Sequence, residues 1–337
     1  MIEQPATPAR PASFRAFCVR IGPSGPELGG IRMDVRGRHL GRARVVRRYI
    51  AVLTVVMAFG VLSSACGTAR IVQTRTTPTT LVPPPPDRHL SVCKSVQTVV
   101  GFALRADGSG WWCVGADGEV SAFNAQVFGS TVGIALSQPI VGIVRTYDDK
   151  GYWLVAADGG VFAFGDARFV GSMGGTHLTK PIVAMAATSS ERGYWLVDAG
   201  GKVFTFGDAE SFGSMGGTPL AKPIVGIATK AHDDGGYWLG AADGGVFAFG
   251  DARYFGSMGG TPLAKPVVGI AASPEGSYWL AAADGGVFTF GFAHFWGSKS
   301  GTPLPGPVVA LSAPATGGYQ LITSNGSQFS CFGICGR

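Results

Sequence analysis

Few residues in this chain of 337 amino acids have the types and spacing that chemistry on a substrate requires. A histidine that stands alone in a sequence is more often a surface or core residue than a general base or a metal ligand. The histidines beyond residue 88 all stand alone in this way: His89, His177, His232 and His294. No serine lies in a Gly-x-Ser-x-Gly elbow, and the recurring Gly-Ser-Met-Gly-Gly precedes no helix that could bind phosphate. We therefore expect no catalytic residues and no cofactor.

Cysteines offer the clearest covalent chemistry. Four of them lie beyond residue 88, namely Cys93, Cys113, Cys331 and Cys335. An even number of cysteines in an exported domain predicts disulfides. We favour a bridge from Cys93 to Cys331 or Cys335, which would join the two ends of the domain; the alternative pairs Cys93 with Cys113 and Cys331 with Cys335. A zinc site is disfavoured because no two of these cysteines have Cys-x-x-Cys spacing, and we expect no metal.

Aspartates recur at two positions of a repeat described below. Asp117, Asp158, Asp243 and Asp284 share one position, and Asp166, Asp208 and Asp251 share another. Such rings of carboxylates can line a channel or bind calcium. However, Asp before Gly is also what a tight turn needs, and we favour that structural role.

Aromatic residues are the better candidates for binding. Rings recur shortly before a Gly-Ser pair in five copies of the repeat: Phe128, Phe169, Phe212, Phe255 and Trp296. Tyr254 and Phe295 add further rings beside them. Exposed rings of this kind can stack on the faces of sugars. The alternative role is to pack an outer strand onto its sheet.

These residues belong to a repeat that occurs six times. Its copies align at Trp112, Trp153, Trp195, Trp238, Trp279 and Gln320, at spacings of 41 to 43 residues. Each copy contains four short apolar runs, as in PIVGIA, GYWLVAA, GVFAF and RFVGS, and Asp-Gly supplies a tight hairpin turn between the second and third. This pattern predicts an all-β fold, a six-bladed β-propeller of four-stranded blades. Residues 89–97 are expected to supply the missing outer strand of the sixth blade.

The repeat resembles the Trp-Leu-Val-Ala-x-Asp-Gly-Gly, Phe-Gly-Asp-Ala and Gly-Ser repeats of exported actinobacterial proteins. The resemblance covers residues 98–333 and implies a propeller, in some of those proteins beside a cell-wall hydrolase. Four positions depart from the pattern: Asn124, Gly200, Phe292 and Gln320. Any binding feature that needs all six copies is therefore in doubt.

The N-terminal quarter has a different composition. Residues 1–50 contain ten Arg and three acidic residues, whereas residues 89–337 contain 14 Lys and Arg against 17 Asp and Glu. The folded part is therefore acidic, which argues against nucleic-acid binding. The apolar run from Tyr49 to Ala65 follows a basic stretch and ends at Cys66, and it resembles a lipoprotein signal in which that cysteine is lipidated. A retained helical anchor and simple secretion are the alternatives.

These observations divide the chain into four parts. Residues 1–32 are disordered or precede the true start at Met33, residues 33–66 form the signal peptide, residues 67–88 a Pro/Thr-rich linker, and residues 89–337 the propeller. We expect a monomer held outside the cytoplasm at the cell membrane through a lipid or N-terminal anchor. We expect it to act as a binding or scaffold module for a protein partner or cell-wall glycan. A hydrolase or lyase at the propeller channel and a purely structural envelope protein are the alternatives.

Overall fold

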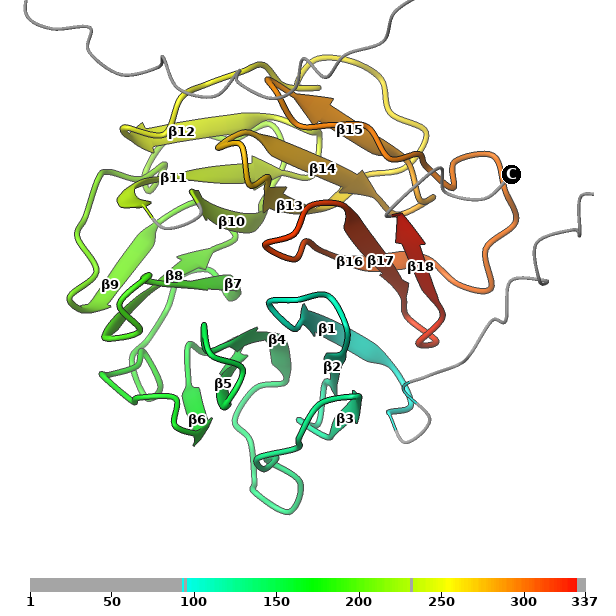
Figure 1. Ribbon diagram of the computed structural model, residues 1–337. Helices are drawn as coiled ribbons and strands as arrows, with labels where there is room; N and C mark the ends of the chain where they lie inside the picture. The colour runs from blue at the N-terminus through cyan, green and yellow to red at the C-terminus, as the bar shows by residue number, and fades with distance from the viewer. Residues whose placement is uncertain (1–92, 94–95, 231–232, 332–337) are drawn as a thin grey trace, which may run out of the picture. The chain divides into compact units, whose positions relative to one another are not determined.

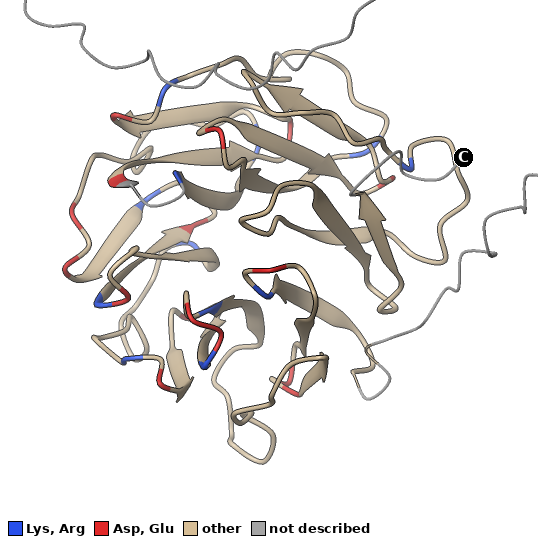
Figure 2. Cartoon of the chain, in the orientation of Figure 1, with Lys and Arg blue, Asp and Glu red and all other residues tan. Residues whose placement is uncertain are grey.

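The computed structural model describes Cys93, residues 96–230 and residues 233–331. The expected signal peptide with Cys66, the linker, His89, His232 and Cys335 lie outside these residues. The described part contains no helix long and apolar enough to cross a bilayer. Its charged residues lie mainly in loops rather than on strands (Figure 2).

The described part is all-β and consists of six antiparallel sheets of three strands each (Figure 1). Chain order is also the order of the strands within each sheet, so the first strand is innermost and the third outermost. In chain order the sheets are β1 (Val99–Leu104), β2 (Trp111–Gly115), β3 (Val120–Phe123); β4 (Ile140–Arg145), β5 (Gly151–Ala156), β6 (Val161–Gly165); β7 (Ile182–Ala187), β8 (Gly193–Asp198), β9 (Val203–Gly207); β10 (Ile224–Lys230), β11 (Asp233–Ala241), β12 (Val246–Gly250); β13 (Val267–Ala272), β14 (Tyr278–Ala282), β15 (Val287–Phe290); and β16 (Val308–Ser312), β17 (Tyr319–Thr323), β18 (Gln328–Cys331).

The six sheets form a closed, propeller-like ring around the inner strands. The first residue of each inner strand donates its backbone N–H to the turn between the second and third strands of the preceding sheet. Ile140, Ile182, Ile224, Val267 and Val308 do so at 2.8–3.0 Å. Val99 makes the same bond to Ser324 O at 2.9 Å, and β1 contacts β16, so the sixth sheet is joined to the first.

Small residues at the third position of each inner strand let the strands approach the axis. Gly or Ala occupies this position in every sheet, where the strand has an irregular register: Gly101, Gly142, Ala184, Gly226, Gly269 and Ala310. A Cβ added at Gly101 would lie 3.0 Å from the Cα of Gly142 in the next sheet. At Gly101, where the first sheet meets the second, the absence of a side chain therefore permits the close approach of the two inner strands.

The hairpin turns confirm the structural role of the first set of aspartates. Each carboxylate oxygen accepts the backbone N–H two residues further on, at 2.9–3.0 Å, as in Asp158 with Gly160. The third sheet has Gly200 in place of this aspartate. There Asp198 takes over the role, because its carboxylate accepts the N–H groups of Gly200 and Lys202 at 2.8 and 2.9 Å.

The expectation of four-stranded blades is wrong, because each sheet has three hydrogen-bonded strands. The expected fourth segment does run back from the end of the third strand to its beginning, since Met173 N donates to Gly159 O at 2.9 Å. However, backbone carbonyl groups of this segment accept hydrogen bonds from side chains instead of from a neighbouring strand. The indole N–H of the tryptophan on the middle strand donates to a carbonyl of this segment at 2.7–2.9 Å in the first five sheets, as from Trp153 to Arg168 O.

A tyrosine from the following sheet binds the same segment. At five of the six junctions in the described part, a fully buried tyrosine donates its hydroxyl to a glycine carbonyl at 2.5–2.7 Å. We call each of these bonds a tyrosine latch; the tyrosines are Tyr152, Tyr194, Tyr237, Tyr278 and Tyr319, and the glycines are Gly129, Gly171, Gly213, Gly256 and Gly297. Each tyrosine ring also contacts the tryptophan of the preceding sheet at 5.3–6.0 Å. The outer segment is thus shared between two sheets.

Candidate functional site: the outer rim and the channel mouth

The aromatic candidates fall into two groups with different environments. Phe128, Phe212, Phe255 and Trp296 are half-buried, and the three phenylalanines pack on the latch tyrosine of the next sheet at 5.8–6.0 Å. Phe169 lies one residue earlier in its copy than the others do. It shares its position with Tyr254 and Phe295, and these three rings are exposed by 57, 56 and 53 %. Packing therefore accounts for the first group, and only the second presents its rings to solvent.

One aromatic residue that breaks the repeat is more exposed than any of these. Phe292 replaces the aspartate of Asp166, Asp208 and Asp251 and is 72 % exposed. Its ring lies edge-on to Phe255 at 6.0 Å, and the guanidinium of Arg253 lies over the same Phe255 ring at 5.4 Å. We call Arg253, Phe255 and Phe292 the rim cluster. It spans the junction of the fourth and fifth sheets.

A repeat-breaking ring pair lies in the same region. His294 and Trp296 occupy, in the fifth sheet, the places that Arg253 and Phe255 have in the fourth, and their rings are 4.4 Å apart. Phe295, between them, is exposed. The outer segment of the fifth copy therefore concentrates solvent-facing aromatic groups that the regular copies lack.

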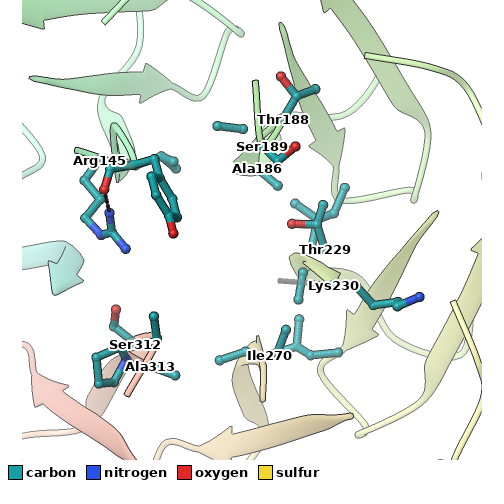
Figure 3. Close-up of a pocket in the computed structure, with 18 of the residues that line it drawn as sticks. Arg145, Ala186, Thr188, Ser189, Thr229, Lys230, Ile270, Ser312 and Ala313 are labelled. Atoms are coloured by element: carbon teal, nitrogen blue, oxygen red, sulfur yellow. Dashed lines mark hydrogen bonds between the residues drawn. The ribbon is translucent and has the colours of Figure 1, made fainter. Parts of the chain in front are cut away.

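A second candidate site is the mouth of the central channel, at the ends where the inner strands lead into the middle strands (Figure 3). It is a cavity of about 350 Å³ with apolar walls that include Val144, Ala187, Ile227, Ile270 and Leu311. Its rim carries polar side chains from several sheets, among them Arg145, Tyr147, Ser189, Glu191 and Asp234. Lys230 belongs to the same rim, but its side chain extends away from the opening and pairs with Asp251 at 3.7 Å.

Acidic side chains at the mouth link neighbouring sheets. Asp149 accepts Ala106 N at 3.1 Å, Glu191 accepts Tyr147 N, and Asp234 accepts Ser189 N at 2.8 Å and Ser189 Oγ at 2.7 Å. Each acid thus binds the loop of the preceding sheet. These carboxylates fix the loops around the opening.

The cationic group at the mouth is also held in place. Arg145 Nη1 donates to the carbonyl oxygens of Thr146 and Tyr147 at 2.9 and 3.1 Å and lies 3.2 Å from Asp149 Oδ1. Burial lowers the pKa of Arg145, while the nearby Asp149 carboxylate acts in the opposite direction. No histidine lines the mouth among the described residues, and these residues include no group of three His, Cys, Asp or Glu that could hold a metal ion.

The second set of aspartates does not line the channel. Asp208 lies in the outer part of its sheet, where it accepts the hydroxyls of Thr188 and Ser190 at 3.0 and 2.6 Å. Asp251 pairs with Lys230. The structure therefore places these carboxylates beside loops of their own sheets and does not bring them together.

The favoured disulfide pairing is wrong, because Cys93 is bonded to Cys113 across a Cα–Cα distance of 6.3 Å. The bridge forms here because the chain around Cys93 packs against the face of the first sheet that Cys113 occupies, in one cluster with Val99, Phe102 and Trp111. Cys331 is disulfide-bonded as well. Cys335 lies outside the described residues.

No family model matches the chain, and no curated protein matches it. Sequence reasoning did not single out the mouth residues, because their grouping depends on ring closure. It noted Phe292 only as a departure from the repeat.

Proposed function

We propose that the protein is an exported β-propeller that binds a protein partner or a cell-wall glycan and is held at the cell membrane by its N-terminus. The single observation that carries the proposal is Phe292, exposed by 72 % at a position where three other copies have Asp. An exposed phenyl ring adds little to the stability of the fold. Aromatic residues, Phe among them, and arginines are, however, enriched at binding interfaces.

Access to the site supports the same proposal. Phe292 N donates to Ser277 Oγ at 2.9 Å, and Ser277 ends the loop in which Pro274 lines the channel mouth. The rim cluster and the mouth therefore lie on the same side of the ring. A single extended ligand can therefore contact both the rim cluster and the channel mouth.

The geometry favours binding over the alternative of a hydrolase or lyase at the channel. A hydrolase of this kind needs a nucleophile beside a base. At the mouth, Ser189 Oγ does donate to the Asp234 carboxylate, but that carboxylate also accepts the Ser189 backbone N–H, and Glu191 accepts the Tyr147 backbone N–H of the preceding sheet. These polar groups already serve the contacts between sheets.

The test compares Phe292→Asp, which restores the residue of the regular copies, with Phe169→Ser, which removes another exposed ring. Serine occupies the corresponding position of the third copy at Ser211. Retention of the full chain on purified cell wall is measured first. Crosslinking to envelope proteins is then measured with a photoreactive residue at position 292 or 169. We expect Phe292→Asp to weaken retention or partner binding at least about tenfold and Phe169→Ser to change it little.

Equal retention on cell wall and equal partner binding of the two variants would contradict a binding site at Phe292. If the parent protein neither binds the wall nor gives a crosslinked partner, the purely structural envelope role is favoured instead.

A further inference from the structure

The junction between the sixth and first sheets lacks the tyrosine of the latch and the tryptophan that the tyrosine ring contacts at the other junctions. Gln320 occupies the place of the tryptophan, and Trp111, which has no hydroxyl to donate, occupies the place of the tyrosine. The backbone bond of Val99 to Ser324 closes this junction near the axis, as in the other five. The outer half of this junction must therefore be held together by a different contact between the sixth and first sheets.

Cys93 occupies a defined place of the repeat on the sixth sheet. A Cβ added at Gly326 would lie 2.9 Å from Cys93 Cβ, just as one at Gly159 would lie 2.5 Å from Met173 Cβ. The following turn is also the same: Val96 N donates to Cys93 O at 3.1 Å, as Thr176 N donates to Met173 O at 2.8 Å. Cys93 thus stands where the regular copies have methionine, although its chain comes from the N-terminal end.

Cys113 stands where the regular copies have leucine. It pairs with Phe102 on the inner strand and Ser121 on the outer strand, as Leu196 pairs with Met185 and Phe204 in the third sheet. In a regular junction, Met173 and Leu196 belong to one apolar cluster that joins two sheets. At the seam between the sixth and first sheets, the same two places are joined by a covalent bond.

We infer that the Cys93–Cys113 disulfide is the sixth latch, so that closure of the outer half of the ring depends on thiol oxidation. The two thiols lose two protons and two electrons to an external disulfide, which is reduced to two thiols as the Cys93–Cys113 bond forms. A dithiol reductant reverses the reaction. Reduction therefore loosens this seam, while the other junctions keep their tyrosine latches.

The test is hydrogen exchange of the full chain in detergent, followed by mass spectrometry of peptides. The key variant is Cys93→Met/Cys113→Leu, which places the side chains of a regular junction at the seam and leaves Cys331 unchanged. The oxidised parent and the parent treated with dithiothreitol are measured beside it. Tyr237→Phe, which removes one regular latch, shows what local loosening looks like elsewhere in the ring.

We expect amides of β1, β2, β16 and β17 to exchange about tenfold faster in the double variant and in the reduced parent than in the oxidised parent. Amides of β7 to β12 should change only in Tyr237→Phe. Unchanged exchange at the seam would overturn the inference. An equal increase in all six sheets would also overturn it, because it would show general destabilisation instead of a seam that opens. If the double variant fails to fold, exchange of β1 and β2 in the reduced parent decides between these outcomes, because the second reducible bond lies at Cys331 on β18 of the sixth sheet.

Discussion

A single tyrosine hydroxyl on one sheet binds two backbone groups of the preceding sheet. The Tyr194 hydroxyl donates to Gly171 O and accepts Val170 N, so two backbone groups of the preceding sheet depend on it. We expect Tyr194→Phe to lower the free energy of unfolding by about 1 kcal/mol, because both groups lose their partner. Urea unfolding measures the change. Tyr254→Phe is the control, since that exposed hydroxyl bonds only to the Ser257 side chain among the described residues.

The latches also make stability depend on pH. Burial raises the pKa of Tyr319 to about 12 from its ordinary value of 10.0. The folded protein thus holds this proton more tightly than the unfolded chain does, so its contribution to stability is complete below pH 10 and is lost as the pH rises through about 12. Unfolding measured from pH 9 to 12 should show this loss, and Tyr319→Phe should reduce it. An equally steep loss in the variant would contradict the assignment.

Substitutions at two nearby glycines distinguish the effect of packing from that of backbone strain. One glycine lies in an outer segment and the other in the loop that follows it. Gly171 has φ 133° and faces Phe206 of the next sheet, where an added Cβ would lie 2.7 Å from the ring; Gly175 has φ 80° and open space. We expect Gly171→Ala to destabilise the protein by about 2 kcal/mol more than Gly175→Ala, because only the first also displaces a ring. Thermal unfolding of both variants provides the measurement, and equal effects would show that strain alone matters.

At the scale of elements, the outer segments are held by side chains instead of a strand ladder. Trp195 Nε1 donates to Glu210 O at 2.7 Å, across the outer strand of its own sheet. We expect Trp195→Phe to speed amide exchange in residues 208–214 about tenfold, because the segment loses this bond while the ring volume is largely kept. Trp296→Phe is the matched control, as three other copies have Phe there. Unchanged exchange in Trp195→Phe would contradict this role of the indole.

These elements show which parts of the fold a sequence can predict. The period of Trp153, Trp195 and Trp238, together with Asp-Gly turns, determines three strands per copy, because those interactions are local in the chain. The prediction of a fourth strand was wrong because Trp and Tyr side chains from two sheets form hydrogen bonds with the backbone of that segment. This arrangement appears only after the ring closes.

The candidate site, like the fold, could be predicted only where it depends on residues that are close in the chain. Phe169 and Phe255 look alike in sequence, yet a one-residue shift exposes the first and packs the second on Tyr278. The disulfide was mispaired because Cys93 and Cys113, separated by 20 residues, bridge two sheets that are the first and last of the chain. Local spacing cannot show that this short loop spans the seam.

At the scale of the whole molecule, attachment to the membrane is the next question. If Cys66 is lipidated, Cys66→Ser should abolish labelling by a fatty-acid analogue and release the protein from the membrane fraction, because the acyl chains provide the anchor. Cys18→Ser is the control and should keep both the fatty-acid labelling and the retention in the membrane fraction. Labelling that persists in Cys66→Ser would contradict lipidation at this residue. Loss of labelling with full membrane retention would favour the retained helical anchor.

The position of Cys93 distinguishes the two faces of the ring. Cys93 lies beside Gly326, in the turn between β17 and β18, whereas the channel mouth lies at the other ends of the inner strands. Cys93 therefore lies at the face of the ring opposite to the mouth. The mouth and Phe292 lie together on the other face, so Cys93 and the rim cluster occupy opposite faces of the ring.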